Sequence, residues 1–352
     1  MTDIARRGGI PHRGVSQAQV AAHAGVSAQT VSRVANQMEN VDPQTRDRVL
    51  ESMRVLGYRL NRTAVALRSG EYRTIGVIMF TLASFGNART WESLALAADR
   101  SGYSVALTPV DRPTGASVRA AFSRLAAQSI DGVIVLLEDH LLGDAEPAML
   151  GDVPVVVIDS AERPGASFVD ADQAMGARQA TEHLLALGHP TVWHIAGPES
   201  SYSAVRRESS WRHTLESRGC RVPPVLRGDW TAASGYRAGL ALRDDPAVSA
   251  VFVGNDQMAL GLLRAFHETG VDVPGHVSVV GFDDMPESAD FWPPLTTVRQ
   301  DFATVGRVAV ERLLDAIAAR DEDAAVATRS VIPTTLIDRA STVPFTTFRS
   351  TP

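Results

Sequence analysis

From Thr74 onward, short runs of buried-strand residues alternate with helical segments, and this alternation constrains the fold more than any other feature of the chain. A strand followed by a helix and a second strand forms a parallel pair that is covered on both faces. Two groups of strands occur: TIGVIMF, YSVALTP, DGVIVLL and PVVVID, then VWHIAG, SAVFVG and VSVVGF. The sequence therefore predicts an α/β core of two doubly wound parallel sheets.

Apolar residues at helical spacing fill the intervals between these strands. The expected helices lie near residues 89–100, 115–128 and 140–150 in the first group, and near residues 174–187, 202–218, 232–243 and 257–269 in the second. Residues 296–299 are expected to cross back to the first sheet, since a helix at 303–319 follows the second group. A last strand, near residues 326–337, is expected to return again.

The stretch VSQAQVAAHAGVSAQTVSRVAN, residues 15–36, predicts two short helices joined by a tight turn. Ser16 and Ser27 are typical N-cap residues, and Gly25 suits a turn that needs a positive φ. The expected helices cover residues 17–24 and 28–36.

The second of these helices has two different faces. Val31 and Val34 can pack on the first helix, whereas the opposite face is small and polar. Gln can pair with an adenine edge, Arg with guanine O6 and N7, and Ala with a thymine methyl, so this face suits the DNA major groove. An ordinary helical hairpin with a solvated face is the alternative. The outer face consists of Ala28, Gln29, Ser32 and Arg33.

Two further segments follow this pair of helices. Asp42 and Pro43 are expected to begin a third helix that ends at Gly57. In NRTAVALRSG, residues 61–70, Asn61 can cap one or two helical turns, or the segment is a plain linker.

The composition excludes several classes of function. All 34 basic residues are arginine, so the chain lacks both the phosphate lysine of a P-loop and a Schiff-base lysine. The single cysteine, Cys220, excludes an internal disulfide and a zinc site built on several thiolates. Neither G-x-S-x-G nor H-E-x-x-H occurs, and no metal or cofactor is expected. No apolar run approaches the ~20 residues of a membrane span, and the start lacks the apolar core of a secretory signal, so we expect a cytoplasmic protein.

Charge is unevenly distributed along the chain. The net charge is −6, yet residues 1–73 contain 11 arginines and 6 acidic residues, a balance of +5 that leaves −11 for the remainder. A basic N-terminal part can meet phosphates while the acidic body stays away from them. A solvated surface would also account for so modest a positive balance.

Several motifs, taken with these elements, resemble the LacI/GalR family of bacterial transcriptional repressors over nearly the whole chain. They occur in the family's order: AGVSAQTVSRVAN, EHLLALGH, AGPESSYSAVRRESSW, GDWTAASGY, GNDQMALG, SVVGFDD and PPLTTVRQDF. The resemblance implies an N-terminal all-α helix-turn-helix domain and an α/β core of two doubly wound parallel-sheet subdomains, similar to periplasmic binding proteins. It also implies a homodimer that binds a roughly palindromic operator in double-stranded DNA.

The expected domain boundaries follow from these elements. They give a flexible tail at 1–14, the helix-turn-helix domain at 15–60, a hinge helix or linker at 61–72, the effector-binding and dimerisation core at 73–340 and a second tail at 341–352. Within the core, the first subdomain is expected at about 73–170 and 302–327, and the second at about 171–300 and 328–340.

The resemblance also implies DNA contacts. Gln29 and Arg33 would contact base edges, and Leu67 of the hinge would wedge into the minor groove beside its dimer mate. A core position for Leu67 is the alternative. The full set is Ser27, Ala28, Gln29, Ser32, Arg33, Asn36, Ala64 and Leu67.

Polar side chains follow the strands at the edge where parallel sheets bind ligands. Asp159, Asn255, Asp256 and Asp283 each follow a predicted strand, and Asp159, Asp256 or Asp283 could instead cap a helix. Carboxylate, amide and guanidinium groups beside one indole face suit a neutral sugar. The family's sugar-contacting positions, carried over by resemblance, are Asp159, Arg207, Trp230, Asn255 and Asp283, with Phe302 as an apolar wall.

These inferences predict a DNA-binding transcriptional repressor and not an enzyme. A sugar bound between the subdomains, such as a galactoside or related glycoside, would lower its operator affinity. The main alternative is a corepressor mode, in which a ligand such as a purine tightens DNA binding. A periplasmic sugar-binding protein would lack residues 15–70, and a carbohydrate enzyme would need an acid and a base, for which Asp159 and Asp283 are the candidates. The C-terminal DRASTVPFTTFRSTP has no leucine heptad, so a dimer is expected rather than a tetramer.

Overall fold

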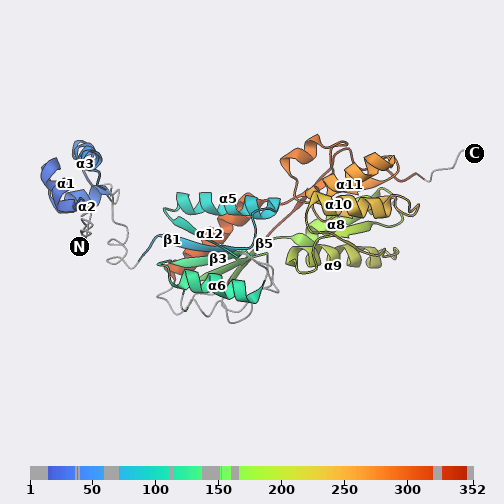
Figure 1. Ribbon diagram of the computed structural model, residues 1–352, viewed down its shortest axis with the longest axis horizontal. Helices are drawn as coiled ribbons and strands as arrows, with labels where there is room; N and C mark the ends of the chain where they lie inside the picture. Colours follow the sequence, from blue (N-terminus) through green and yellow to red (C-terminus); the bar gives the residue numbers. More distant parts are fainter. Residues whose placement is uncertain are drawn as a thin grey trace, which may run out of the picture. The chain divides into compact units, whose positions relative to one another are not determined.

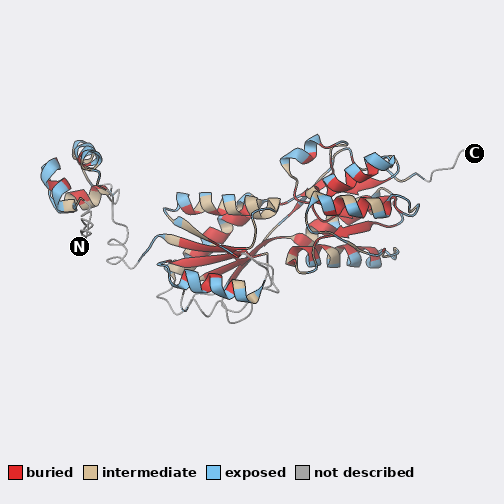
Figure 2. Ribbon diagram, in the orientation of Figure 1, coloured by how far each residue is buried: buried red, intermediate tan, exposed pale blue. Residues whose placement is uncertain are grey.

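The computed structural model of this protein describes residues 15–35, 38, 40–58, 71–110, 114–136, 151, 153–159, 166–319 and 327–346. The chain divides into two compact units, residues 1–72 and 73–352. Each unit has its own buried core (Figures 1 and 2). Within the described ranges, no helix combines the length and the apolar character needed to cross a membrane.

The described part of the first unit consists of three helices, α1 (Gln17–Ala24), α2 (Ala28–Ala35) and α3 (Pro43–Leu56). Ser16 forms a capping box at α1, and Gly25 ends that helix with a φ of 67°. The Ser27 hydroxyl accepts a hydrogen bond from the Thr30 amide at 3.1 Å and so caps α2. The predicted helix, tight turn and helix are confirmed, and residue 36, the expected end of α2, lies outside the described residues.

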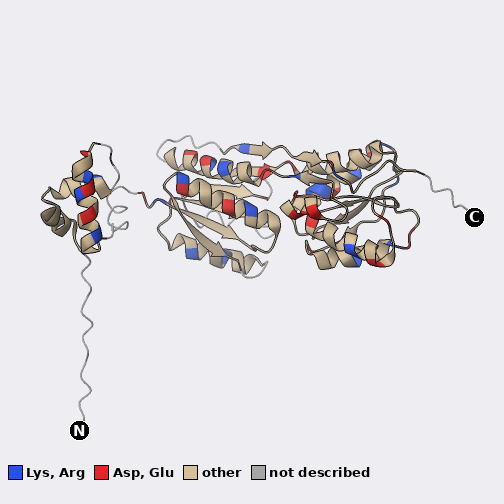
Figure 3. Cartoon of the chain, turned by 90° about the horizontal axis from the view of Figure 1, so that it is seen from above, with Lys and Arg blue, Asp and Glu red and all other residues tan. Residues whose placement is uncertain are grey.

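Apolar side chains from all three helices form the core of this unit. Arg48 Nε donates to the Ala24 carbonyl at 3.0 Å, which ties α3 to the end of α1. The exposed face of α3 carries charges of both signs (Figure 3). The buried residues of the core are Val20, Ala21, Ala24, Val31, Val34 and Val49.

The first subdomain of the second unit is built on a six-stranded sheet of parallel strands in the order β11-β5-β4-β3-β1-β2. Its helices α5 (Phe85–Arg100) and α12 (Phe302–Ala318) pack on one face of the sheet, and α6 (Gly115–Ala126) packs on the other (Figure 1). The strands are β1 (Thr74–Met79), β2 (Ser104–Pro109), β3 (Gly132–Leu136), β4 (Val155–Ile158), β5 (Ser167–Ala171) and β11 (Arg329–Ile332).

The second subdomain is built on a four-stranded parallel sheet in the order β7-β6-β8-β9. Two helices pack on each face, α8 with α9 and α10 with α11, and the short 3-10 helix η2 (Pro286–Asp290) follows β9. The elements are β6 (Trp193–Ala196), β7 (Leu226–Arg227), β8 (Ala250–Val253), β9 (Ser278–Val280), α8 (Gln173–Ala186), α9 (Tyr202–Ser217), α10 (Ala232–Leu242) and α11 (Asp256–Thr269).

The chain passes between the subdomains at three places, after β5, before α12 and after β11 (Figure 1). Two strands near these crossings, β10 (Thr297–Arg299) and β12 (Thr335–Ile337), pair antiparallel in a small sheet of their own. The first subdomain therefore contains segments from both ends of the core. Three short connections, and not a single hinge, join it to the second subdomain.

Some expectations need correction. The last strand, expected at 326–337, is two strands in different sheets, because Pro333 interrupts it and β11 pairs with β5 while β12 pairs with β10. Residues 329–332 thus belong to the first subdomain and not to the second, where the boundary at 328 had put them. Strands β5 and β7 were not expected, and α5 begins four residues before residue 89. The expected helix at 140–150 lies outside the described residues.

Candidate functional site

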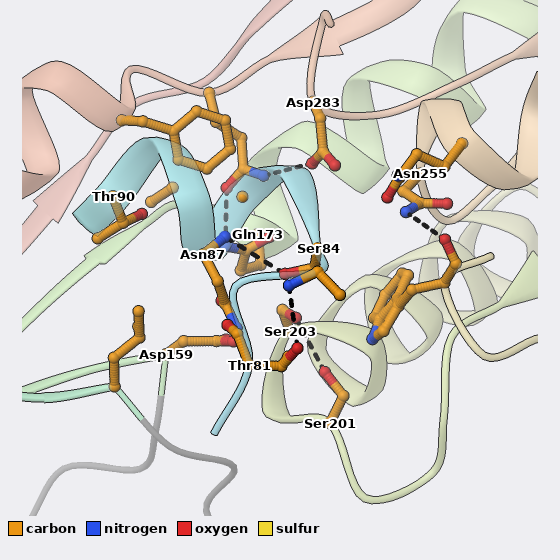
Figure 4. A pocket seen from close by; sticks show the side chains of 18 of the residues that line it. Thr81, Ser84, Asn87, Thr90, Asp159, Gln173, Ser201, Ser203, Asn255 and Asp283 are labelled. Carbon is orange, nitrogen blue, oxygen red and sulfur yellow. Dashed lines mark hydrogen bonds between the residues drawn. The ribbon is translucent and has the colours of Figure 1, made fainter. Parts of the chain in front are cut away.

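A cavity of about 440 Å³ lies between the two subdomains, at the carboxyl ends of their strands (Figure 4). Its size is typical of small-molecule sites. All six residues predicted from the sequence for the ligand site line this one cavity, although they come from six different segments of the chain. They are Asp159, Arg207, Trp230, Asn255, Asp283 and Phe302.

Arg207, on α9, is the central cation of the cavity and is only 4% exposed. Its Nη2 lies 3.8 Å from Asp283 Oδ1, and its Nε donates to Gln173 Oε1 at 2.9 Å. The guanidinium carbon lies 3.8 Å from the centre of the Phe282 ring. These contacts fix the side chain in one orientation, as a positioned donor group requires.

Asp283 lies at the end of a hydrogen-bonded chain of amides that the sequence did not predict. Gln300 Nε2 donates to Asp283 Oδ1 at 2.7 Å, and Gln173 Nε2 donates to Gln300 Oε1 at 3.0 Å. Gln173 also donates to Asp170 Oδ1 at 3.3 Å. Gln173 and Gln300 stand at two of the crossings between subdomains, so this network connects both halves of the cavity. Long-range contacts of this kind leave no periodic signal in the sequence.

Backbone strain concentrates at the cavity. Five non-glycine residues of the described chain have a positive φ, and three of them are predicted site residues: Asp159 (53°), Trp230 (69°) and Asp283 (110°). Non-glycine residues adopt such angles only where the surrounding structure compensates, and they cluster at functional sites. This observation supports the site independently of the pattern that predicted it.

Burial changes the acidity of the carboxyl groups around Arg207. Loss of solvent raises the pKa of Asp283 to about 6, although the Arg207 charge and the Gln300 hydrogen bond act in the opposite direction. Burial likewise raises the pKa of Asp170 to about 7 and lowers the pKa of Arg207. Burial thus disfavours the charged forms of both carboxyl groups and of Arg207 in this cavity.

Trp230 and Asn255 are hydrogen-bonded neighbours in the second subdomain. Asn255 Nδ2 donates to the Trp230 carbonyl at 3.2 Å, and its Oδ1 accepts from the Met258 amide at 2.9 Å. Asn255 is thus the N-cap of α11 while it also lines the cavity. A Cβ at Gly197 would lie 2.2 Å from the Trp230 ring, so the glycine makes room for the indole.

Asp256, a candidate helix cap in the sequence, has a different role. It is fully buried, accepts hydrogen bonds from Thr297 Oγ1 at 2.6 Å and Ser288 Oγ at 2.7 Å, and does not line the cavity. Burial and the neighbouring Asp283 charge raise its pKa to about 7. This carboxyl group holds β10 and η2 to the start of α11.

In the first unit, the face of α2 that was predicted to contact DNA is accessible. Ser27, Ala28 and Gln29 are exposed and Ser32 and Arg33 are partly exposed, whereas Val31 and Val34 are buried. The predicted contacts Asn36, Ala64 and Leu67 lie outside the described residues.

The sequence matches two family models. Residues 17–61 match the model described as bacterial regulatory proteins, lacI family, and residues 181–342 match the periplasmic binding protein-like domain. The lactose operon repressor of Escherichia coli (strain K12) is 36% identical over 92% of this chain and 89% of the relative. This chain therefore belongs to the LacI family of bacterial regulatory proteins, as the resemblance of its motifs implied.

Further similar proteins are also regulators of transcription. The repressor PurR of Haemophilus influenzae (strain PittEE) is 30% identical over 92% of this chain and 97% of the relative. A crystal structure of the lac repressor dimer bound to operator and the anti-inducer ONPF is similar with a TM-score of 0.84 and 34% identity, covering 94% of this chain and 100% of that one. The complex of the regulator CelR with cellobiose is similar with a TM-score of 0.69 and 32% identity. The match covers 93% of this chain and 99% of the CelR chain.

Proposed function

We propose that this protein is a sequence-specific transcriptional repressor whose operator affinity is lowered by a sugar bound between the two subdomains of its core. The observation that carries the proposal is the convergence of all six predicted ligand residues on one cavity, in a chain that also has an accessible helix-turn-helix. The protein would act without catalysis, and in the cytoplasm, where its operator is found.

The proposed DNA contacts are made by α2 and by the hinge. Gln29 and Arg33 would bind base edges in the major groove, with Ser27, Ala28, Ser32 and Asn36 beside them. Ala64 and Leu67 would contact the minor groove, where the cost of unstacking is offset by the bend and the contacts it allows. One α2 contacts few base pairs, so two copies in a homodimer would bind a palindromic operator. Sedimentation of the full chain should give the mass of a dimer, and a tetramer would contradict this.

The chemistry of the cavity favours a neutral sugar, such as a galactoside or a related glycoside. Asp159 and Asp283 can accept from neighbouring hydroxyl groups, Arg207 can donate to them, and Trp230 offers an aromatic face to the apolar side of a sugar ring. Phe302 closes the cavity with a second apolar surface. The cellobiose complex of CelR, a similar protein, is consistent with a carbohydrate in this place.

The mechanism follows from the position of the cavity. A ligand that contacts both subdomains favours one relative orientation of them, and the small β10–β12 sheet and the crossings transmit that orientation through the core. If the favoured orientation is incompatible with operator binding by both DNA-binding units of a dimer, the sugar acts as an inducer.

The test has two stages. An operator is first selected from random duplex DNA with the full-length protein, and mono- and disaccharides are screened by thermal shift. Each stabilising sugar is then added to the complex of protein and operator at fixed salt. We expect at least one sugar to weaken operator binding at least fivefold, which is the lower end of allosteric effects. Failure of every stabilising sugar to change operator affinity would refute the induction mechanism.

A corepressor mode is the second candidate, favoured by the similarity to PurR. In that mode the ligand, such as a purine, binds the same cavity and tightens operator binding. Hypoxanthine and guanine belong in the same thermal-shift screen. Stabilisation by a purine together with stronger operator binding would replace the sugar proposal.

A further inference from the structure

The wall of the cavity that belongs to the first subdomain has a group of polar side chains among its apolar ones. This group consists of Thr81, Ser84, Asn87 and Thr90, in and just before the start of α5, and Ser203 of the second subdomain lies opposite (Figure 4). Two of these groups have structural partners. Ser84 Oγ caps α5 by accepting from the Asn87 amide at 3.3 Å, and Asn87 Nδ2 donates to the Thr81 carbonyl at 3.0 Å. No described residue donates to Asn87 Oδ1, which leaves that acceptor for a ligand.

Thr90 differs from the other buried threonines on helices. Thr181 and Thr214 each donate to the carbonyl four residues earlier, at 2.7 and 2.8 Å. Thr90 is only 4% exposed, yet its hydroxyl has no hydrogen-bond partner among the described residues. A hydroxyl that has no partner in the described protein and borders a cavity is available to water or to a ligand in that cavity.

The surroundings of Thr90 indicate where that partner comes from. Thr90 lines the cavity, as do the apolar side chains of Leu136 of β3, Ile158 of β4 and Val305 of α12. Because the described residues make no hydrogen bond to the Thr90 hydroxyl, a molecule in the cavity can supply one.

We propose that Thr90 and Asn87 hydrogen-bond the half of the effector that lies against the first subdomain, so that the effector carries hydroxyl groups on both halves, as a disaccharide does. This inference rests on the proposed function, because it assumes a sugar ring against Arg207, Asp283 and Trp230 of the opposite wall. A glycoside with an apolar second half would displace water from Thr90 and Asn87 without replacing its hydrogen bonds, and that loss lowers affinity.

The test compares matched ligands that share their first ring. Lactose is paired with phenyl β-D-galactopyranoside, and cellobiose with phenyl β-D-glucopyranoside, in calorimetric titrations of the full-length protein. The second ring is hydroxylated in one member of each pair and apolar in the other. We expect the disaccharide of the preferred pair to bind about tenfold or more tightly than its phenyl partner, since each hydrogen bond at a buried group contributes about that factor.

The variant Thr90→Val keeps the shape of the side chain and removes its hydroxyl. It should reduce the preference for the disaccharide about tenfold, mainly by weakening disaccharide binding, whereas Thr90→Ser should retain the preference. Thr108→Val is the matched control, because Thr108 is also buried in the first subdomain but does not line the cavity. The Thr108→Val variant should prefer the disaccharide over its phenyl partner to the same extent as the unmodified protein does.

The outcomes separate the two proposals. Binding of both members of a pair without a preference for the disaccharide overturns this inference and leaves the sugar proposal in place. The same holds if Thr90→Val changes the affinity for both members equally. If none of the four ligands binds, the proposal of a glycoside effector fails and this inference fails with it.

Discussion

At the residue scale, the shape of the cavity depends on the contact between Trp230 and Gly197. The indole carbon Cζ2 of Trp230 would lie 2.2 Å from a Cβ at position 197, closer than any real contact. Trp230 also has a φ of 69°, and its carbonyl is held by Asn255. These contacts hold the indole in one position, and a methyl group at residue 197 would occupy the same space as the indole.

The variant Gly197→Ala should consequently lose ligand affinity by tenfold or more while the protein stays folded. The added methyl displaces the Trp230 ring from the cavity, and overpacking of this kind costs about 1–3 kcal/mol of stability. Calorimetric titration with a glycoside that binds the unmodified protein measures the affinity. Gly115→Ala serves as the control, because its Cβ would meet only the flexible end of Arg119. Equal affinities of the two variants would contradict the prediction.

The buried carboxyl group of Asp256 makes the stability of the fold depend on pH, and this dependence can be tested. Its pKa in the folded protein, about 7, is higher than that of an exposed aspartate, about 3.9. The protonated group therefore stabilises the fold below pH ~4, and this contribution is lost as the pH rises towards 7. Asp256→Asn keeps an acceptor for the Met285 amide and Ser288 and can donate to Thr297.

We expect Asp256→Asn to be at least as stable as the unmodified protein at pH 7. The free energies of unfolding of the two proteins, obtained by urea titration from pH 4 to pH 8, should diverge in favour of the variant as the pH rises, by up to about 1.4 kcal/mol per pH unit. A difference that does not vary with pH would show that the carboxyl group is ionised throughout this range.

At the scale of elements, the start of a helix could be predicted from the sequence where an N-cap residue marks it. Ser16, Ser27 and Asp42 begin α1, α2 and α3 where the sequence predicted, because an N-cap acts within one turn. Strand β5 was missed because SFVDA contains polar residues, Ser167 and Asp170, that are buried by their tertiary contacts. Its identity depends on β4 and β11 on either side, which no local pattern records.

The assignment of α2 as the helix that contacts bases predicts a specific defect for Arg33→Ala. Loss of an arginine contact to guanine should reduce discrimination between the operator and unrelated DNA by about 1–3 kcal/mol, while salt-sensitive nonspecific binding is largely retained. Fluorescence anisotropy with both DNAs at several salt concentrations measures the two effects. Arg54→Ala, on the exposed face of α3 beside Glu51, should leave discrimination unchanged. Unaltered discrimination in Arg33→Ala would refute the assignment.

At the scale of the whole molecule, the proposed regulation couples a cavity in one unit to DNA binding by the other. Thermodynamic linkage requires that the sugar and the operator weaken each other's binding by the same factor. Calorimetry of a binding sugar with the free protein and with the protein saturated by operator should give affinities that differ by that factor, in the range of about 5- to 150-fold. Equal sugar affinities in the two titrations would rule out the coupling.

The sequence by itself determined the helix-turn-helix, the alternation of strands and helices and the residues at the strand ends, because caps, turns and hydrophobic periodicity act over a few residues. The resemblance of its motifs to the LacI/GalR family implied which six side chains to expect in the ligand site. Only the tertiary structure decided that residues 329–332 and 335–337 belong to different sheets, and that Gln173 and Gln300 join Asp170 to Asp283. It also decided that Thr90 lines the cavity and that its hydroxyl has no partner among the described residues. These features depend on contacts between residues far apart in the chain, whose energies are set by burial and geometry and not by local pattern.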